Sequence, residues 1–216
     1  MENRRFDAFV FDMDGTLLHS LPDLIDATNS TLEHFGYPTH NEQQILEMIG
    51  NGLRSLILQA LPQDLDPQTT EEALAWWKAY YDGHGNTKTT VFDGMMETLA
   101  QLKTAGCKLA VLSNKYDRGV KALSAQYFGD LMDFALGDGP VPRKPDPQGL
   151  LLVAETLDVE IDRVAYVGDS DVDMMVANNA GAFPIGCTWG YQPLDHLTAH
   201  NPGAIIDSPA DLLKFL

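Results

Sequence analysis

The segment Phe6–Thr16 constrains the fold of this chain most strongly. It begins with a short apolar run, rich in Phe and Val, that is too short for a convincing helix and is typical of a buried strand. From Ser20 to Lys88 the pattern of apolar residues is helical throughout, with no convincing strand. The first strand therefore has no partner nearby and must pair with strands much further along the chain.

Those partners lie after Phe92, where strands alternate with helices as far as Leu216. This alternation favours a mainly parallel sheet with right-handed crossovers. We therefore expect an α/β protein with a Rossmann-like, mainly parallel core at residues 1–15 and 89–216. An all-helical domain at residues 16–88 is expected as an insertion after the first strand.

The first strand ends at two aspartates, Asp12 and Asp14, followed by Gly15 and Thr16. If the strand register continued, both carboxylates would share a face at its carboxyl end, where ligands of open α/β sheets bind. Two close carboxylates repel each other unless a cation, a proton or hydrogen-bond donors compensate. A plain Asp-Gly turn and a generic metal loop remain alternatives.

The net charge of the chain limits which partners and substrates it can bind. The chain has 31 acidic and 14 basic side chains among 216 residues, a formal net charge of −17, spread along its length. Such a field does not attract nucleic acid or an anionic membrane, so neither is expected as a partner. An anionic substrate would need local cations or backbone N–H groups to overcome the repulsion.

Other features of the sequence point to a cytoplasmic location. Cys107 and Cys187 form neither a C-x-x-C pattern nor a disulfide framework, which suits a reducing compartment. No signal peptide is recognised, and no apolar run approaches the roughly 18 residues that span a bilayer.

Two later strands also end in polar residues, and a basic residue lies in a proline-rich loop. These candidate site residues are Ser113, Asn114, Asp169, Asp173 and Lys144. Each has an ordinary alternative, because Ser113-Asn114 and Asp169-Ser170 can cap helices and lysine is usually solvated. The carboxyl ends of parallel strands share one edge of a sheet, however, and separate caps do not explain why all these groups would gather there.

Phosphoryl transfer is the chemistry that fits this set of residues. Carboxylate oxygens suit Mg²⁺, which takes only one or two carboxylates and keeps several waters. A carboxylate can attack phosphorus, a second can exchange protons with the leaving alcohol and with water, and a lysine can stabilise the transferring group.

The sequence also resembles the haloacid dehalogenase-like hydrolases over nearly its whole length. The resemblance is carried by four motifs in the family's order and spacing: Phe11-Asp12-Met13-Asp14-Gly15-Thr16-Leu17, Ser113-Asn114-Lys115, Lys144-Pro145 and Gly168-Asp169-Ser170-Asp171-Val172-Asp173. The presence of Asp14 favours the phosphatase branch over the dehalogenases, and the insertion is similar to the helical cap of that branch. Further stretches look like those of phosphoglycolate phosphatases: Phe92-Asp93-Gly94, Lys144-Pro145-Asp146-Pro147 and Thr188-Trp189-Gly190-Tyr191.

The resemblance implies a role for each motif residue. Asp12 would be the nucleophile and a Mg²⁺ ligand, and Asp14 the general acid/base whose backbone carbonyl also binds the metal. Asp169 would be a further metal ligand supported by Asp173. Phosphate oxygens would be held by Ser113, Asn114 and Lys144, the last of which also steadies Asp12.

Three features of the insertion bear on the substrate. His19 departs from the acidic residue that relatives usually carry. Arg54 is a candidate for binding a substrate carboxylate, because arginine matches that group bidentately, although an exposed helix arginine is the ordinary interpretation. The aromatic residues are interpreted as packing or a subunit contact rather than as a ligand platform: Trp76, Trp77, Tyr80 and Tyr81.

The sequence thus predicts a Mg²⁺-dependent phosphatase that forms an aspartyl-phosphate and acts on a small phosphorylated metabolite such as 2-phosphoglycolate. Within the same superfamily a nucleotidase, a pyrophosphatase or a sugar-phosphate mutase remain alternatives. A regulatory protein that kept the fold without the chemistry is a more distant one, because Asp12, Asp14, Lys144 and Asp169 are all intact. A monomer or a homodimer is expected.

Overall fold

The computed structural model describes residues 5–84 and 86–216. The chain divides into two compact units, one made of the segment up to Leu18 together with Val91–Leu216, the other of His19–Thr90. The division falls two or three residues after the boundaries proposed from the sequence, which were placed after residues 15 and 88.

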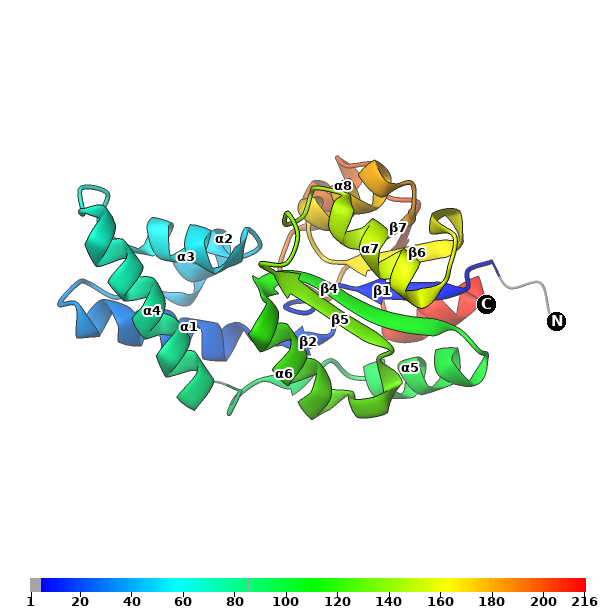
Figure 1. The fold of residues 1–216 in the computed structure, drawn as a ribbon, viewed down its shortest axis with the longest axis horizontal. Coiled ribbons are helices and arrows are strands. Elements are labelled where there is room, and N and C mark those ends of the chain that lie inside the picture. Colours follow the sequence, from blue (N-terminus) through cyan, green and yellow to red (C-terminus); the bar gives the residue numbers. More distant parts are fainter. Residues whose placement is uncertain (1–4, 85) are drawn as a thin grey trace. The chain divides into compact units, whose positions relative to one another are not determined.

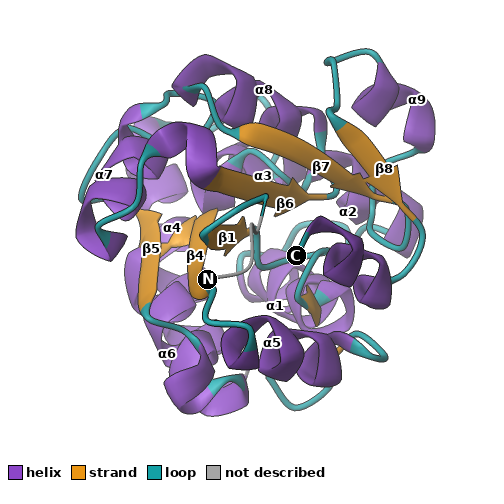
Figure 2. Ribbon diagram, turned by 90° about the vertical axis from the view of Figure 1, so that its right-hand side faces the viewer, coloured by secondary structure: helices purple, strands orange, loops and turns teal. Residues whose placement is uncertain are grey.

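The first unit is built on one six-stranded sheet in the order β5-β4-β1-β6-β7-β8 (Figures 1 and 2). All neighbouring strands run parallel, so the expected Rossmann-like α/β core is confirmed. The strands are β1 (Ala8–Phe11), β4 (Lys108–Tyr116), β5 (Phe134–Asp138), β6 (Val164–Gly168), β7 (Phe183–Cys187) and β8 (Ala204–Ile206). The strand β1, first in the sequence, therefore lies in the middle of the sheet.

Both faces of this sheet are covered, which explains why β1 is apolar throughout. Phe9 and Phe11 belong to the buried cluster shared with residues of α5, α6 and the C-terminal 3₁₀-helix, whereas Ala8 and Val10 belong to the cluster shared with α7 and α8. The alternation follows from the two-residue period of a strand. The covering elements are α5 (Met95–Thr104), α6 (Asp117–Tyr127), α7 (Gln148–Leu157), α8 (Asp171–Ala180) and the 3₁₀-helix Pro209–Phe215.

Several short elements differ from the sequence prediction. The sequence pattern at residues 209–216 predicts a closing helix, but the segment Pro209–Phe215 is a 3₁₀-helix. The short helix α9 (Leu194–Thr198) has no counterpart in the sequence prediction. Two further 3₁₀-helices lie at Gly129–Leu131 and Ile161–Arg163. The two-residue strands β2 (Leu18–His19) and β3 (Thr90–Val91) form a separate small sheet.

Among its described residues, the second unit contains four helices: α1 (Leu21–His34), α2 (Glu42–Met48), α3 (Gly52–Ala60) and α4 (Pro67–His84). The sequence predicts Asn41 as the cap of a second helix, and Asn41 does cap α2, in a capping box with Gln44. The residues around Ser20 predict a helix start there, and α1 does begin at Leu21 with Ser20 as its N-cap residue, although the Ser20 side chain forms no cap hydrogen bond. None of the helices among the described residues is long and apolar enough to cross a membrane.

The aromatic residues of α4 divide into two rows. Trp77 and Tyr81 are buried and stack with ring centroids 4.7 Å apart, and the Trp77 indole N–H donates to the Thr28 hydroxyl at 3.2 Å. Trp76 and Tyr80 are half-buried and stack on one another. Trp77 and Tyr81 therefore belong to the core of the helical unit, as the packing interpretation held.

Candidate active site

The strands β1 and β6 end at nearly the same level of the sheet, and their neighbour β4 continues past that level to Tyr116. Phe11 at the end of β1 is in register with Val111 of β4 on one side and with Val167 of β6 on the other. The residues that follow these three positions therefore lie along one edge, next to one another. This edge is also where the order of the strands reverses direction around β1, the position at which open α/β sheets bind ligands.

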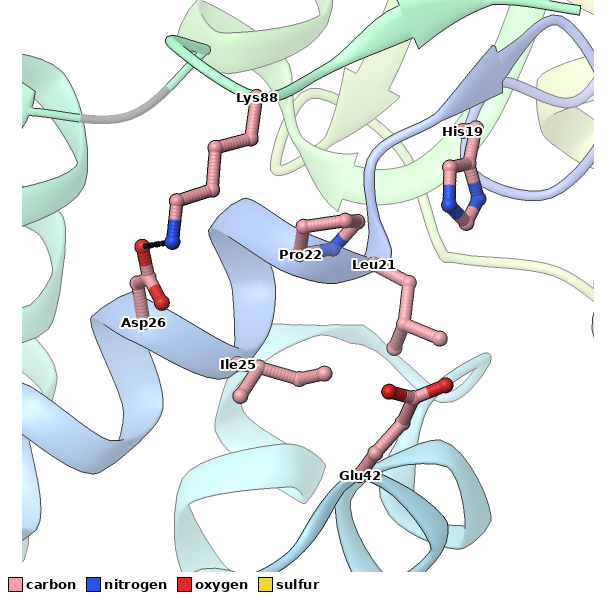
Figure 3. A pocket seen from close by; sticks show the side chains of 7 residues that line it. All are labelled: His19, Leu21, Pro22, Ile25, Asp26, Glu42 and Lys88. Atoms are coloured by element: carbon pink, nitrogen blue, oxygen red, sulfur yellow. Dashed lines mark ion pairs between the residues drawn. The ribbon is translucent and has the colours of Figure 1, made fainter.

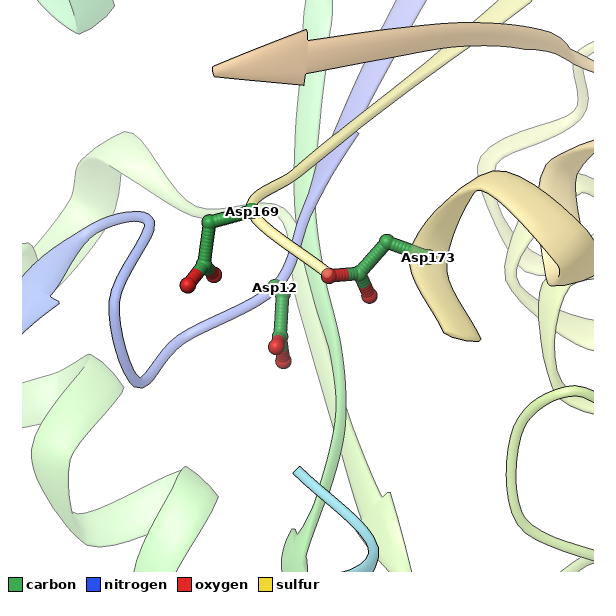
Figure 4. A group of neighbouring side chains, drawn as sticks. All are labelled: Asp12, Asp169 and Asp173. Carbon is green, nitrogen blue, oxygen red and sulfur yellow. The ribbon is translucent and has the colours of Figure 1, made fainter. Parts of the chain in front are cut away.

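Three carboxylates meet at this edge. Asp12, Asp169 and Asp173 each offer an oxygen, and these oxygens lie within 4.8 Å of one another (Figure 4). Asp12 directly follows β1, and its backbone N–H donates to the Val167 carbonyl at 2.9 Å. The strand ends at Phe11, so Asp12 and Asp14 do not continue its register as the sequence suggested, and they have different surroundings.

Lys144 supplies the positive charge of this cluster. Its Nζ lies 3.1 Å from Asp12 Oδ1 and 2.7 Å from Asp173 Oδ1, and it donates to the Tyr166 hydroxyl at 2.9 Å. Only 3% of the side chain is exposed, so the alternative of a solvated loop lysine is wrong. Burial alone would lower the pKa of Lys144, but the two adjacent carboxylates outweigh it and raise the pKa.

Asp169 is fixed through both of its carboxylate oxygens. The Thr16 hydroxyl donates to Oδ1 at 2.8 Å, and the backbone N–H of Tyr191 donates to Oδ2 at 2.8 Å. A Cβ at Gly190 would stand 2.1 Å from the Asp169 Cβ, so only glycine allows the loop after β7 to approach this closely. The Trp189 indole N–H in turn donates to the Thr16 carbonyl at 3.0 Å, which joins this loop to the segment after β1.

Asp173 has a different set of contacts, because it belongs to the cap of α8. Ser170 and Asp173 form a capping box, in which Asp173 Oδ2 accepts from the Ser170 N–H at 3.0 Å and from its hydroxyl at 2.6 Å. Ser170 therefore caps α8, as the alternative interpretation of Asp169-Ser170 proposed. With Oδ1 bound to Lys144, both oxygens of Asp173 already have donors.

Ser113 and Asn114 lie within β4, which continues to Tyr116, rather than at the start of a helix. The next helix, α6, begins at Asp117, so the alternative that these residues cap it is wrong. The Asn114 side-chain amide donates to the Lys144 carbonyl at 3.1 Å and so links β4 to the lysine loop. Both side chains are buried at the edge that carries Asp12.

The crowding of carboxylates shifts their protonation. Burial raises the pKa of Asp12 to about 6, with Lys144 opposing the shift and Asp173 adding to it. Burial, followed by Asp173 and Asp12, raises the pKa of Asp169 to about 8. Burial is the main cause of both shifts, and the neighbouring carboxylates add to them; a bound cation would offset this repulsion between carboxylates.

The donor set fits a small hard cation. Among the described residues, Asp12 Oδ1 is buried and has no hydrogen-bond partner of acceptable geometry, although Lys144 Nζ lies 3.1 Å away. Mg²⁺ prefers oxygen ligands and takes only one or two carboxylates. Each Asp173 oxygen already accepts from two donors, whereas each Asp169 oxygen accepts from one. Asp12 and Asp169 are therefore the two carboxylates that could hold the ion.

Asp14 lies apart from these three carboxylates and is paired with Lys115. The Lys115 Nζ is 3.2 Å from Asp14 Oδ1 and 3.3 Å from Oδ2. The Asp14 side chain is 14% exposed, so it remains reachable from solvent while its partner is buried.

Arg54 and His19 belong to the helical unit. Arg54 lies on α3 and pairs with Glu71 of α4 at 2.6 Å, with more than half of each side chain exposed. A pocket of about 210 Å³ in the same unit is shown in Figure 3. It is lined by His19, Leu21, Pro22, Ile25, Asp26, Glu42 and Lys88, and Lys88 is paired with Asp26 at 2.6 Å. The substrate role considered for Arg54 stays a prediction.

Four residues of the site were missed by sequence reasoning. Thr16 stands in the first motif and Lys115 in the second, so the motifs held a signal for both. Tyr166 interrupts an aliphatic strand, and its hydroxyl donates to the Leu112 carbonyl at 2.7 Å. Tyr191 acts through its backbone N–H, which no pattern of side chains could reveal.

Fold and site together define an α/β protein with an acidic, cation-compatible centre at the carboxyl edge of a parallel sheet. The family model of the haloacid dehalogenase-like hydrolases matches residues 9–186. The chain therefore belongs to this family, as the four motifs suggested.

Individual relatives agree with this assignment. A phosphoglycolate phosphatase from Vibrio parahaemolyticus is 32% identical, covering 99% of this chain and 97% of that protein. Phosphoglycolate phosphatase 1 from Pseudomonas aeruginosa is 35% identical, covering 94% of this chain and 77% of that protein. The crystal structure of a predicted phosphoglycolate phosphatase from Haemophilus somnus superposes with a TM-score of 0.92 at 29% identity, covering 98% of both chains. The chain belongs to the phosphoglycolate phosphatase-like branch of the family.

Proposed function

We propose that this protein is a Mg²⁺-dependent phosphatase that hydrolyses a small phosphate monoester, with 2-phosphoglycolate as its substrate. The observation that carries the proposal is the meeting of Asp12, Asp169 and Lys144 at one sheet edge, with a buried Asp12 oxygen that lacks a well-formed hydrogen bond. The choice of substrate rests on the names of the relatives, which share about a third of their residues with this chain.

In the proposed reaction, an Asp12 oxygen attacks phosphorus and the bond from phosphorus to the ester oxygen breaks. Asp14 gives its proton to the departing alcohol. Asp14 then takes a proton from water, which attacks the aspartyl-phosphate and releases inorganic phosphate, so Asp12 is restored. Ser113, Asn114 and Lys144 hold the phosphate oxygens during both steps.

A bound Mg²⁺ would offset the negative charge of the carboxylates and of the transferring phosphoryl group. Asp12, Asp169 and the backbone carbonyl of Asp14 would hold it. Asp173 would support this arrangement indirectly, by fixing Lys144 and the start of α8. The helical unit is proposed to serve as a cap that excludes water during the reaction.

The decisive variant is Asp12→Asn, which is nearly isosteric but cannot form the aspartyl-phosphate. We expect it to lose turnover of 2-phosphoglycolate by at least about a thousandfold while its far-ultraviolet circular dichroism stays that of the wild type. Phosphate release should be measured with and without Mg²⁺ on a panel that includes nucleotides, pyrophosphate and sugar phosphates. If Asp12→Asn turned over substrate as fast as the wild type, Asp12 would not be the nucleophile. If the wild type hydrolysed none of the esters, the alternative of a non-catalytic protein would be favoured.

A further inference from the structure

Lys115 is a buried lysine for which the proposed reaction has no role. Only 5% of its side chain is exposed, although lysine is rarely buried without a partner. Its Nζ approaches both oxygens of the Asp14 carboxylate, at 3.2 and 3.3 Å. The two residues come from different strand ends, Lys115 from β4 and Asp14 from the segment after β1.

The backbone that carries Lys115 is itself held in place by β5. The pairing of β4 with β5 shifts register between Leu112 and Tyr116, so the chain around Lys115 departs from regular strand geometry. A Cβ at Gly137 would stand 2.6 Å from the Lys115 carbonyl oxygen, so only glycine allows β5 to approach so closely. The Gly137 N–H also donates to Asp117 Oδ1 at 3.0 Å. The lysine therefore extends from a fixed base toward Asp14.

We propose that Lys115 is a positioning residue for Asp14 and that it controls the step in which the alcohol departs. Contact with both oxygens restricts rotation of the carboxylate and gives it one orientation. The inference rests on the proposed function, in which Asp14 gives a proton to the ester oxygen.

A proton donor matters most when the leaving group is poor. Glycolate departs as a basic alkoxide and needs a proton, whereas p-nitrophenolate is stable as an anion and departs without one. The ratio kcat/KM covers only the steps up to the departure of the alcohol, so the later hydrolysis of the aspartyl-phosphate does not enter it. Comparing kcat/KM for the two esters therefore isolates the step that Asp14 serves.

We expect Lys115→Met to lower kcat/KM for 2-phosphoglycolate by at least about tenfold, because general acid catalysis is worth roughly 10²–10⁴-fold. The value for p-nitrophenyl phosphate should change by less than about threefold by the same reasoning. Asp14→Asn should show the same selectivity, and the double variant should lose little more than Asp14→Asn alone, because both changes act on one step. Lys115→Arg, which keeps the charge, should recover part of the loss.

Lys121→Met provides the matched control. Lys121 pairs with Asp117 at 2.7 Å, but its side chain is 56% exposed and it has no place at the site. Its kinetics on both esters should match the wild type. Should Lys115→Met fail to fold, Lys115→Gln serves in its place, and a thermal melt accompanies each variant.

Two outcomes would overturn the inference. Equal losses on both esters would mean that Lys115 binds phosphate or supports the fold, and no loss on either would mean that it has no part in the reaction. Failure of the proposed function itself would look different, because the wild type would then hydrolyse neither ester or Asp12→Asn would remain active.

Discussion

At the scale of single residues, Asp169 shows how the site is held by residues that do no chemistry themselves. Its Oδ1 accepts from Thr16 and its Oδ2 from Tyr191, so both oxygens have fixed directions. Hydrogen-bond partners of this kind usually orient a metal ligand, and their loss costs about 10–100-fold in metal affinity or activity.

Thr16→Val tests this arrangement, because valine keeps the shape of threonine and removes the donor to Asp169. We expect Mg²⁺ affinity to fall about tenfold or more, as measured by isothermal titration calorimetry on the full chain. Thr156→Val is the matched control, since the Thr156 hydroxyl donates only to the Leu152 carbonyl within α7. Equal Mg²⁺ affinity in Thr16→Val and the wild type would show that the hydroxyl does not orient the ligand.

The sequence revealed the acidic and phosphate-binding candidates of the motifs. It missed residues whose roles depend on the neighbours they contact, and these include Thr16 and Lys115, although both stand in motifs. Asp12 and Asp169 could be found because an acidic residue directly after an apolar strand is unusual. Lys144 could be placed at the edge only through its motif, since nothing in a proline-rich loop shows that its Nζ lies 3.1 Å from Asp12. The distinct surroundings of Asp14 depend on where β1 ends, which the residue pattern does not show.

At the scale of elements, the most informative anchor joins α1 to the chain that returns from α4. Asp23, in the first turn of α1, is 2% exposed and accepts hydrogen bonds from the backbone N–H groups of Lys88 and Thr89 at 3.1 and 2.6 Å. The Thr89 hydroxyl adds a further bond of 2.6 Å to the same oxygen. Hydrogen bonds to a buried charged group contribute about 1.5–3 kcal/mol each.

Asp23→Ala should therefore lower the free energy of unfolding by about 2 kcal/mol or more, because buried donors lose their acceptor. Asp26→Ala, one turn along the same helix, removes only an exposed ion pair with Lys88 and should have a much smaller effect. Urea unfolding followed by tryptophan fluorescence measures both. Similar losses in the two variants would contradict the role given to Asp23.

Elements with strong periodicity were predicted well and short ones were not. The helices of the insertion and the central strands have long apolar patterns whose period shows their type. The carboxyl end of β4 looks like a loop because Ser113, Asn114 and Lys115 are polar, yet pairing with β5 resumes at Tyr116. The segment Pro209–Phe215 has a capping residue but forms a 3₁₀-helix, a choice that local sequence does not determine.

At the scale of the whole molecule, the net charge of −17 opposes the binding of any anion. Two buried lysines supply positive charge at the site that offsets this repulsion: Lys144 beside Asp12 and Asp173, and Lys115 beside Asp14. The carboxylates at this edge still outnumber these lysines. Burial and the repulsion between neighbouring carboxylates raise the pKa values of Asp12 and Asp169. Removal of metal should therefore make the stability of the protein depend on pH.

A group whose pKa is higher in the folded protein than in the unfolded chain stabilises the fold at low pH. This stabilisation is lost as the pH rises to the pKa of the group in the folded protein. The pKa of Asp12 is raised from 3.8 to about 6 and that of Asp169 to about 8, and each unit corresponds to about 1.4 kcal/mol. With a chelator present, the melting temperature should fall from pH 5 to pH 8, and Mg²⁺ should restore it most at pH 8. Asp169→Asn should flatten this dependence, because it removes the carboxyl group with the higher of the two pKa values. A chelated wild type whose melting profile matches that of Asp169→Asn at every pH would mean that Asp169 is already ionised without metal, and the charge imbalance inferred for this edge would be absent.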